Sequence, residues 1–457
     1  MPETLRSVGI DVGTTTTQLV VSELRVENQA SAFSVPRLTI TERKIVYESP
    51  VYFTPLLSGN LVDGESIRGI VEKEYGAAGI IRQSVDTGAI IITGETSRKE
   101  NARAVLAALS DYAGEFVVAT AGPDLESVLA AKGAGAVAFS EQTEAPVLHM
   151  DIGGGTSNLA LLKNGKVVQT GCLNVGGRLI KTGSRGEVTY ISPVLAGLTH
   201  CRVGEVPSES ALREAAETLT NALEMAAGLR EPTDLLKKLT TEEITAPWHI
   251  PEETPFLSFS GGVADCIENE REPSAFGDIG VYLGQAIRKS RLCAGKYRLG
   301  SQTIRATVIG AGSHSTRLSG STVFYRHVEF PMKNLPVVRL TAHEQESPER
   351  ITAALGSKDS PLVALSLPGY ASPNHEQVSR MADAIAKGIR GSTPVICLEG
   401  DMAKALGHSL CLRLPPETPC LCIDQVAFTE DSYLDVGAPV GSALPVVVKT
   451  LVFSREE

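Results

Sequence analysis

The 457-residue sequence has few aromatic side chains: they make up 5% of it, and Trp248 is the single tryptophan. Aliphatic residues must therefore fill most of the core, which suits parallel strands covered by helices better than a β-sandwich. At about 150 residues per domain, the chain is long enough for roughly three domains. We expect an α/β protein.

The sequence also lacks any tract of lysine and arginine. It has 42 basic and 53 acidic residues, a net charge of −11, whereas nucleic acids and anionic membranes require a basic surface. No apolar run approaches the ~18 residues of a transmembrane helix, and residues 1–4 lack the basic and apolar regions of a signal peptide. We therefore expect a cytoplasmic protein with no nucleic-acid partner and no membrane partner.

Cysteine pairs are absent as well. The eight cysteines include no Cys-x-x-Cys pair, although Cys420 and Cys422 stand one residue apart, and the eight histidines show no metal-ligand spacing. This pattern predicts free thiols in a reducing compartment, and neither a disulfide framework nor a zinc site.

What the sequence does contain is a duplicated local pattern. The apolar stretch 5–10 leads into the acidic loop 11–17, and the same order returns when residues 146–150 lead into the acidic loop 151–158. Each copy predicts a strand, a glycine-containing acidic loop and a second strand, and Asn164-Gly165 marks a hairpin after the second copy. Two related halves of this kind predict a domain pair with a cleft between them.

The two acidic loops have the composition of a phosphate-binding site. Glycines let backbone N–H groups approach phosphate oxygens, and nearby hydroxyl groups add donors. Asp11 and Asp151 beside a triphosphate would repel it unless a divalent cation lay between them, so they predict Mg²⁺ held through water. Either aspartate could also act catalytically by orienting the attacking water. Two hairpin turns without a ligand are the alternative, which the matching positions of the loops disfavour. The expected nucleotide-binding residues of the loops are Gly13, Thr14, Thr15, Thr16, Gly153, Gly154, Gly155 and Thr156.

These loops, the turn Ser260-Gly261-Gly262, and small-residue helices expected at 125–138 and 278–288 resemble the actin-like ATPase superfamily. The resemblance implies a duplicated, ribonuclease H-like α/β fold whose cleft binds ATP or ADP with Mg²⁺. It places Ser260, Gly261 and Gly262 against adenosine, and makes the two helices the crossing between the halves. It also implies an acidic residue near the first helix, for which Asp124 and Glu126 are equal candidates, although both could simply cap that helix.

Within this superfamily, the whole chain resembles the ethanolamine ammonia-lyase reactivating factors. The segments that carry this resemblance are Val8–Thr17, Asp151–Asn158, Thr307–Ser315 and Pro445–Phe453. It implies a chaperone-like factor with weak ATPase activity, which binds the inactivated lyase, releases damaged cobalamin and lets adenosylcobalamin enter. The implied partner is ethanolamine ammonia-lyase in ethanolamine catabolism, and association with a bacterial microcompartment is left open. We expect no tightly bound cobalamin on this chain, because the acidic surface need not bind cobalamin itself.

We expect three parts along the chain, of which the last recognises the partner. They are a first ATPase domain at 1–145 with an inserted subdomain at 33–85, a second ATPase domain at 146–300, and a C-terminal α/β region at 301–457. In the C-terminal region the expected strands are 363–367 and 395–398, and the expected helices are 375–389 and 401–408.

Several alternatives stay open. The segment Ile309–Ser315 contains part of a dinucleotide fingerprint; a tight turn between strands is the favoured interpretation, and an adenosine loop is the alternative. A small-molecule kinase of the same superfamily is the main alternative function, and its catalytic acid would be Glu95, Asp124 or Glu126. A filament-forming protein is the non-enzymatic alternative. His149 is expected to be a buried core histidine rather than a general base, and the oligomeric state is left open.

Overall fold

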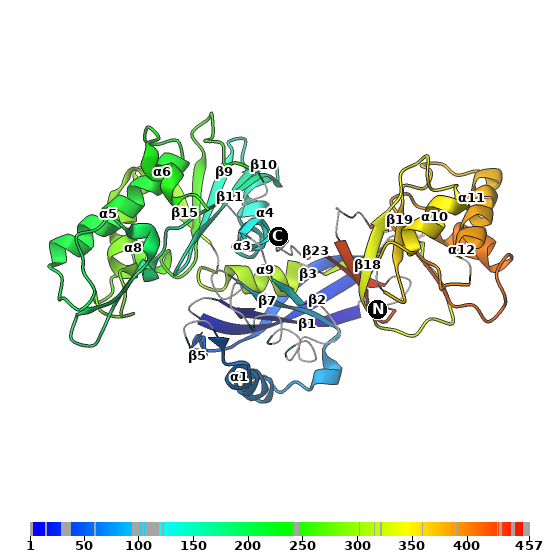
Figure 1. The fold of residues 1–457 in the computed structure, drawn as a ribbon, viewed down its shortest axis with the longest axis horizontal. Helices are drawn as coiled ribbons and strands as arrows, with labels where there is room; N and C mark the ends of the chain where they lie inside the picture. The colour runs from blue at the N-terminus through cyan, green and yellow to red at the C-terminus, as the bar shows by residue number, and fades with distance from the viewer. Residues whose placement is uncertain are drawn as a thin grey trace.

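The computed structural model describes most of the chain and shows three lobes in a row (Figure 1). The central lobe contains the first strands of the chain and α1 (Gly64–Ala77), and an α/β lobe lies on either side. In this described part, no helix is long and apolar enough to cross a bilayer, and no disulfide joins the eight cysteines. The described residues are 3–13, 16–28, 38–58, 61–93, 101, 105, 109, 118–120, 123–241, 246–300, 302–314, 316–319, 322–358, 360–389, 391–426, 428, 432–439 and 444–450.

The central lobe is built on a mixed sheet, which we call the first sheet. Its strands are β1 (Glu3–Val12), β2 (Thr16–Asn28), β3 (Leu38–Glu48), β4 (Tyr52–Phe53), β7 (Thr87–Ile92) and β8 (Val118–Thr120). The order is β3-β2-β1-β7-β8; β2 is antiparallel to β1 and β3, whereas β7 runs parallel to β1 and β8 to β7. Helix α1 packs on this sheet through Ile67, Val71 and Tyr75.

The stretch 33–85 does not stand apart as an inserted subdomain in the described residues. Strands β3 and β4 both pair with β2, so this stretch extends the first sheet, and only the small hairpin of β5 (Leu56–Ser58) and β6 (Leu61–Val62) forms a sheet of its own. The mixed, turn-rich composition of the stretch concealed β3, because its outer face is largely exposed and polar.

The second sheet repeats the arrangement of the first. Its strands are β9 (Val147–Ile152), β10 (Ser157–Lys163), β11 (Lys166–Leu173), β14 (Phe256–Ser260) and β15 (Tyr297–Leu299). The order is β11-β10-β9-β14-β15, with an antiparallel meander on one side of β9 and two parallel strands on the other. The same order and directions in both sheets confirm the expected duplicated, actin-like ATPase fold. The other elements of this lobe are β12 (Ile180–Thr182), β13 (Val188–Ile191), α4 (Ala136–Ser140), α5 (Glu209–Ala226), α6 (Asp234–Leu239), α7 (Asp265–Glu268) and α8 (Gly280–Lys289).

Two helices cross between the halves, and each packs on the sheet of the half that it does not follow in the sequence. We call them the exchanged helices. Helix α3 (Pro123–Gly133) follows the first sheet but packs on β9, β10 and β11, whereas α9 (Ala306–His314) follows the second sheet but packs on β1, β2 and β7. The helices also pack on each other, and only glycine fits at the contact: a Cβ at Gly133 would overlap the Ala306 carbonyl, and one at Gly310 would overlap the Leu129 carbonyl. The crossing expected at 125–138 is therefore found in α3, but the segment is not one helix: α3 ends at Gly133, and α4 begins at Ala136 after Gly135, which has a positive φ.

The helix that packs against α3 is α9 and not the helix expected at 278–288. Helix α8, in the segment 278–288, packs on α5 and α7 within its own lobe, and α9 makes the crossing instead. The described part of Ile309–Ser315 is accordingly neither a turn between strands nor an adenosine loop. Helix α9 is apolar or small on all sides because it is buried between a sheet and a helix, so it shows no helical period in the sequence.

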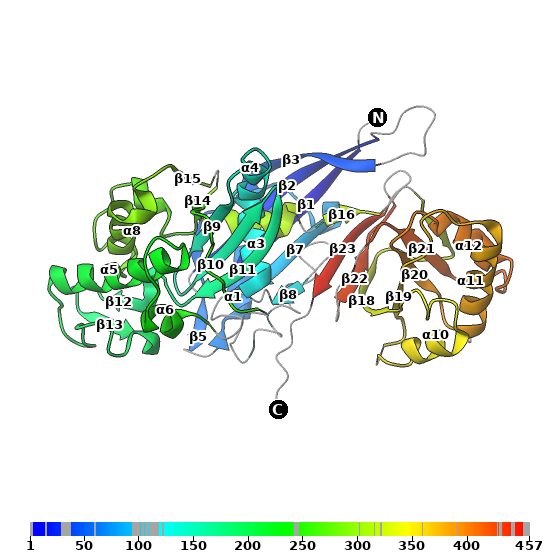
Figure 2. The same cartoon turned by 90° about the horizontal axis from the view of Figure 1, so that it is seen from above.

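The C-terminal lobe contains an eight-stranded sheet, the C-terminal sheet, of order β16-β23-β22-β18-β19-β20-β21-β17. Its elements are β16 (Thr316–Leu318), β17 (Phe324–Arg326), β18 (Met332–Arg339), α10 (Pro348–Leu355), β19 (Ala364–Leu367), α11 (His375–Gly388), β20 (Val395–Leu398), α12 (Ala403–Cys411), β21 (Cys420–Asp424), β22 (Ser432–Val436) and β23 (Pro445–Thr450). The alternation of strands and helices expected after residue 360 is confirmed. Figure 2 shows β23 on the side that faces the first sheet, where Val447 packs against Ala89, Leu129 and Ala311.

Candidate functional site

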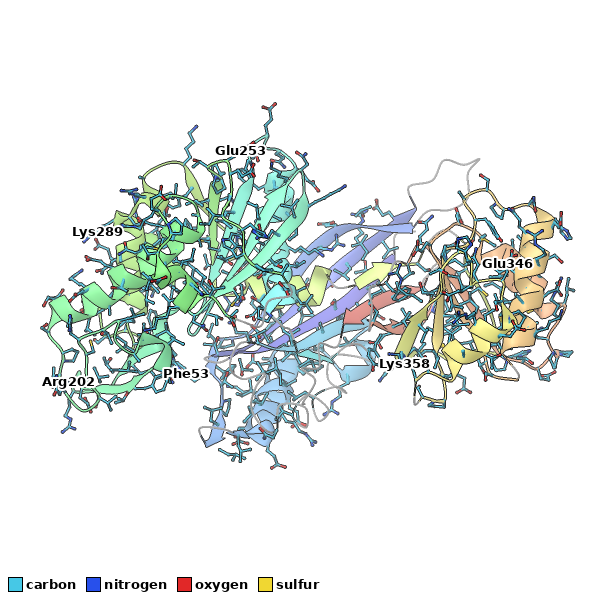
Figure 3. All side chains as sticks on the ribbon, turned by 45° about the horizontal axis from the view of Figure 1, so that its top comes forward. Phe53, Arg202, Glu253, Lys289, Glu346 and Lys358 are labelled. Carbon is cyan, nitrogen blue, oxygen red and sulfur yellow. The ribbon has the colours of Figure 1, made fainter. Side chains whose placement is uncertain are left out.

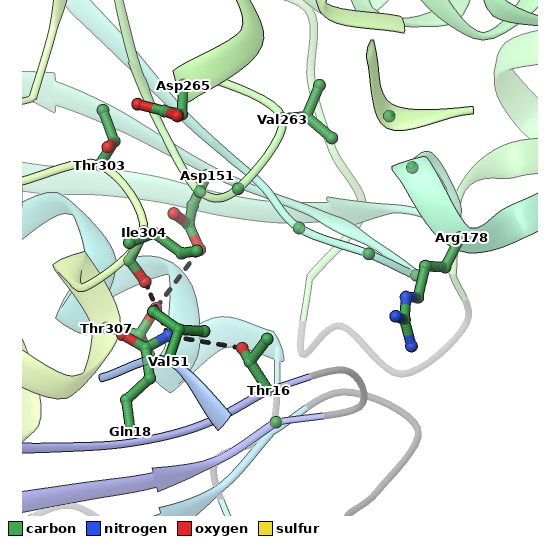
Figure 4. A pocket seen from close by; sticks show the side chains of 18 of the residues that line it. Thr16, Gln18, Val51, Asp151, Arg178, Val263, Asp265, Thr303, Ile304 and Thr307 are labelled. Carbon is green, nitrogen blue, oxygen red and sulfur yellow. Dashed lines mark hydrogen bonds between the residues drawn. The ribbon is translucent and has the colours of Figure 1, made fainter. Parts of the chain in front are cut away.

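A cavity of about 550 Å³ lies between the two halves. Both acidic loops line it, together with the segment that leads into α9, and Figure 4 shows Gln18, Asp151 and Thr307 beside one another in it. Thr14 and Thr15 lie outside the described residues. The other residues expected from the sequence that line the cavity are Asp11, Gly13, Thr16, Glu126, Asp151, Gly153, Gly154, Gly155, Thr156, Gly261 and Gly262.

The two acidic loops close in the same way. The backbone N–H of Gly13 donates to the Thr16 carbonyl at 2.9 Å, and that of Gly153 donates to the Thr156 carbonyl, also at 2.9 Å. Each loop joins the two antiparallel strands of its hairpin, β1 to β2 and β9 to β10. The duplication in the sequence is thus a duplication of backbone geometry, and it brings both loops to one cavity.

Asp11 lies near the end of β1, where the Thr93 hydroxyl donates to its Oδ1 at 2.9 Å. Burial raises the pKa of Asp11 to about 7; the Thr93 hydrogen bond opposes this rise, and the charge of Asp151 adds to it. A cation near a buried carboxyl group favours its ionised form and offsets the free-energy cost of burying the charge.

Asp151 occupies the corresponding place at the end of β9 and has more hydrogen-bond donors. The Ser260 hydroxyl donates to Oδ1, and the Thr307 hydroxyl donates to Oδ2 at 3.3 Å. Burial raises the pKa of Asp151 to about 6, and these two hydrogen bonds keep it from rising further. Two carboxyl groups with raised pKa values in one cavity fit a site for a divalent cation.

Ser260 does not face the cavity, as a residue that contacts adenosine would. It is fully buried and does not line the cavity, because its hydroxyl is used by Asp151. His149 Nε2 lies 2.9 Å from Ser260 Oγ, and His149 Nδ1 lies 3.1 Å from Ser258 Oγ. Burial and Arg298 lower the pKa of His149 to about 3, so the ring is neutral, and Nε2 donates to Ser260. The expectation of a buried core histidine is confirmed.

Two amides near the aspartates were missed by the sequence analysis. Gln18 stands directly opposite Asp11 in the β1–β2 ladder, and Asn158 stands opposite Asp151 in the β9–β10 ladder. Both line the cavity, and Gln18 Oε1 and Asn158 Oδ1 are buried without a hydrogen-bond partner in the described structure. A buried acceptor without a donor is unfavourable, so these atoms also fit a hydrated cation. The strand register that brings the amides opposite the aspartates could have identified them.

Arg178 is a further residue for which the sequence offered no signal. It belongs to the short 3₁₀ helix Gly177–Leu179, and its backbone N–H donates to the Gly154 carbonyl at 2.7 Å. Its side chain lies 3.4 Å from the Asp278 carboxylate, and its guanidinium lies 5.1 Å from the ring centroid of Phe53. Phe53 lies at the edge of the central lobe that faces the second sheet's lobe (Figure 3). Arg178 therefore links the two halves at the cavity.

The two acidic candidates at the start of α3 have different surroundings. Asp124 accepts a hydrogen bond from the Thr170 hydroxyl on β11, which holds the helix to the second sheet. Glu126 is 9% exposed and lines the cavity, whereas Asp124 does not. Of the pair, Glu126 is the acid that faces the site.

Comparison with known proteins identifies the relatives of this chain. The family model described as "Ethanolamine utilisation protein EutA" matches residues 3–454. The chain is 40% identical to the ethanolamine ammonia-lyase reactivase EutA of Salmonella typhimurium strain LT2 and 38% identical to that of Escherichia coli K12; each alignment covers 98% of both chains. Among solved structures, it is similar to the Aquifex aeolicus member of the Ppx/GppA family, with 14% identity, a TM-score of 0.43, and coverage of 67% of this chain and 97% of that one.

Proposed function

The chain belongs to the family of the ethanolamine utilisation protein EutA, and from this membership we propose that it is an ATP-dependent factor that reactivates ethanolamine ammonia-lyase. In this proposal it binds the inactivated lyase, promotes release of damaged cobalamin and leaves the lyase free to take up adenosylcobalamin. The factor acts in the cytoplasm, and it holds no cobalamin tightly itself.

The cavity between the halves is the proposed site of ATP or ADP with Mg²⁺. Asp11 and Asp151 would hold the cation through water, and Gly261 and Gly262 would lie against adenosine. Two observations support this site: the raised pKa values of both carboxyl groups, and the buried acceptor oxygens beside them. Bound Mg²⁺ would neutralise phosphate charge and stabilise the charge of the transition state of hydrolysis. The proposed phosphate-binding residues are Gly13, Thr14, Thr15, Thr16, Gly153, Gly154, Gly155 and Thr156.

Weak hydrolysis of ATP would use the acids of the cavity. Asp11 and Asp151 are the proposed catalytic carboxylates, since they face the space between the two loops. Glu126 faces the same space from α3 and is a third acid able to accept a proton from an attacking water. The lowered pKa of His149 and its two serine partners leave it no role as a base at neutral pH.

Nucleotide and lyase would be coupled through the exchanged helices. Each acidic loop contacts the phosphates from its own half, so loss of the γ-phosphate removes contacts that join the halves. Helices α3 and α9 lie between the sheets, and β23 of the C-terminal sheet packs on them through Val447. We propose that the C-terminal lobe recognises the lyase, and that the factor binds an open form of it more tightly than the closed form. It can shift that equilibrium only by this difference in affinity.

Reactivation in a defined mixture tests the proposal. Ethanolamine ammonia-lyase is inactivated with cyanocobalamin, and the protein is then added with Mg²⁺, ATP and adenosylcobalamin. Lyase activity should return, it should require ATP, and the Asp151→Asn variant should fail to restore it although its melting temperature is no lower than that of the wild type. If activity stays absent, or returns equally without ATP, the proposal is wrong, and phosphorylation of small-molecule acceptors would then test the kinase alternative.

A further inference from the structure

We propose that Gln18 and Asn158 are positioning residues whose side-chain oxygens accept hydrogen bonds from the water molecules of the cation between Asp11 and Asp151. The inference rests on the proposed nucleotide site and extends it. The two amides would give that site a preference for a cation that keeps its hydration shell, and each half of the molecule supplies one of them.

The strand register places each amide beside its aspartate. In an antiparallel pair, directly opposite residues project their side chains to the same face of the sheet. Asp11 is paired with Gln18, and Asp151 is paired with Asn158. Both amides line the cavity that the aspartates line, and Figure 4 shows Gln18 in it near Asp151. The same carboxylate–amide pair therefore faces the cavity from each half.

The oxygen of each amide lacks a donor in the described structure. Gln18 is 3% exposed and Asn158 is 2% exposed, and neither Gln18 Oε1 nor Asn158 Oδ1 has a hydrogen-bond partner there. The orientation of Gln18 is set by its nitrogen: Nε2 donates to the Ile304 carbonyl at 3.2 Å and to Thr16 Oγ1 at 3.4 Å. A carbonyl only accepts, so Oε1 is the atom that remains for a ligand.

The chemistry of these oxygens selects what they can bind. An amide oxygen accepts hydrogen bonds and donates none, so it cannot bind a phosphate oxygen directly. Water molecules on a divalent cation are strong donors, and Mg²⁺ in proteins usually keeps several of them. A hydrated cation between the loops supplies donors to both amides and both carboxylates at once. The ribose hydroxyls and the amino group of adenine are the other donors in an adenine nucleotide, and one such group could satisfy only one of the two amides.

Magnesium affinity measured with and without nucleotide tests the role. Asn158→Leu and Gln18→Leu remove the acceptor oxygen, whereas Asn158→Asp and Gln18→Glu retain one. In the ADP complex, each leucine variant should bind Mg²⁺ about tenfold more weakly by calorimetry. The affinity for ADP in EDTA should not change, and the acidic variants should bind Mg²⁺ at least as tightly as the wild type. Equal weakening of ADP binding in EDTA would overturn the inference, since it would show a structural role or a ribose contact.

Cobalt(III) hexammine distinguishes contact through water from direct coordination. Its six ammonia ligands do not exchange and can only donate, so it occupies sites for fully hydrated Mg²⁺. It should bind the ADP complex of the wild type, and Asn158→Leu should weaken it by the same factor as Mg²⁺. Binding of the hexammine that Asn158→Leu leaves unchanged would overturn the inference, because the amide oxygen would then accept no hydrogen bond from the ligands of the cation.

The controls separate failure of this inference from failure of the proposed function. Asn221→Leu, on α5 and not among the residues that line the cavity, should change neither affinity. Melting temperatures report folding of each variant, and Asn158→Ala replaces Asn158→Leu if the larger side chain prevents folding. A wild type that binds no Mg²⁺–ADP contradicts the nucleotide site itself. A wild type that binds it, with leucine variants that bind it equally well, contradicts only the role of the amides.

Discussion

The two halves of the ATPase fold present the same groups to the cavity but connect them differently to the rest of the molecule. In each half a carboxylate near the end of the central strand has an amide opposite it and accepts a hydrogen bond from a hydroxyl after or at the end of the next parallel strand. The two sets are Asp11, Gln18 and Thr93, and Asp151, Asn158 and Ser260. Among the described residues, the carboxylate of the second set also accepts a hydrogen bond from Thr307 on α9, whereas in the first set it is the amide of Gln18 that reaches this segment, by donating to the Ile304 carbonyl before α9.

This difference shows where the halves become coupled. Helix α9 packs on the first sheet, so the contact between Thr307 and Asp151 ties the second acidic loop to the opposite half. The Asp11 carboxylate accepts its hydrogen bond from Thr93, which directly follows β7 of the same sheet. Duplication of the hairpin therefore supplies two similar binding surfaces. Through the contact of α9 with Asp151, a shift of the first sheet would also shift the second acidic loop.

The largest expected effect comes from removing the charge of each aspartate in turn. Asp151 has the lower of the two raised pKa values, about 6 against about 7, so it carries more negative charge at neutral pH. Asp151→Asn and Asp11→Asn should each weaken Mg²⁺–ADP about 10- to 100-fold, with the larger loss at Asp151. Calorimetry measures both, with Asp234→Asn, an exposed residue of α6, as the control. Equal losses would mean that the halves are functionally as well as structurally equivalent.

The exchanged helices give the next effect, which should be equal in the two halves. Gly310→Ala on α9 and Gly133→Ala on α3 each force a methyl group into a backbone carbonyl of the other helix. Each should cost about 1–3 kcal/mol of unfolding free energy, measured by urea denaturation. Gly69→Ala in α1 is the matched control: nothing lies within 4 Å of its Cβ, so it should stabilise by about 0.5–1 kcal/mol. A harmless Gly310→Ala would argue against the close contact of α3 and α9.

A smaller effect concerns pH in the absence of metal. The folded state holds the Asp11 proton up to a pKa of about 7, whereas the unfolded state releases it near 3.8. Between these values the folded protein binds more protons, so its stability falls as the pH rises. Asp11→Asn removes this titration while keeping an acceptor for Thr93. The variant should therefore gain about 1 kcal/mol relative to the wild type between pH 6 and pH 7 in EDTA. A difference that does not depend on pH would contradict the raised pKa.

The smallest expected effect is a change in the angle between the halves. Contacts to the γ-phosphate join both acidic loops, so the ADP complex should be slightly more open than the complex with a non-hydrolysable ATP analogue. Small-angle scattering of the two complexes measures the change, with the nucleotide-free protein as reference. Profiles that coincide within error would mean that α3 and α9 hold the halves in one arrangement.

The duplicated hairpins and their aspartates could be predicted because their signals are local. A strand, an acidic glycine loop and a second strand follow one another without interruption, at 3–28 in the first copy and 147–163 in the second. The alternating strands and helices of the C-terminal lobe are equally local. Gln18 and Asn158 depend on strand register, which a sequence fixes only through the partner strand. Thr307 and Arg178 depend on distant segments that meet in the fold.

Helix α9 shows why some of the site was misread. Its sequence, Ala-Thr-Val-Ile-Gly-Ala-Gly-Ser-His, is apolar or small up to its final histidine, and residues 306–312 are all buried, so no polar face reveals its period. Its glycines therefore suggested a turn between strands. In the fold they permit contact with β1 and α3, where Gly312 approaches Gly9 and Gly310 approaches Leu129.

The place of β23 in the C-terminal sheet has a consequence for the order in which the chain folds during synthesis. β23 is the last described strand along the chain, yet it is the second strand of the sheet, between the edge strand β16 and β22. β16 must therefore wait for more than a hundred later residues to emerge before it has a partner, whereas both nucleotide-binding hairpins are complete once residue 163 has emerged. A ribosome adds about 5–20 residues per second, so β16, which follows soon after the last residues that line the nucleotide cavity, stays without its strand partner for several seconds.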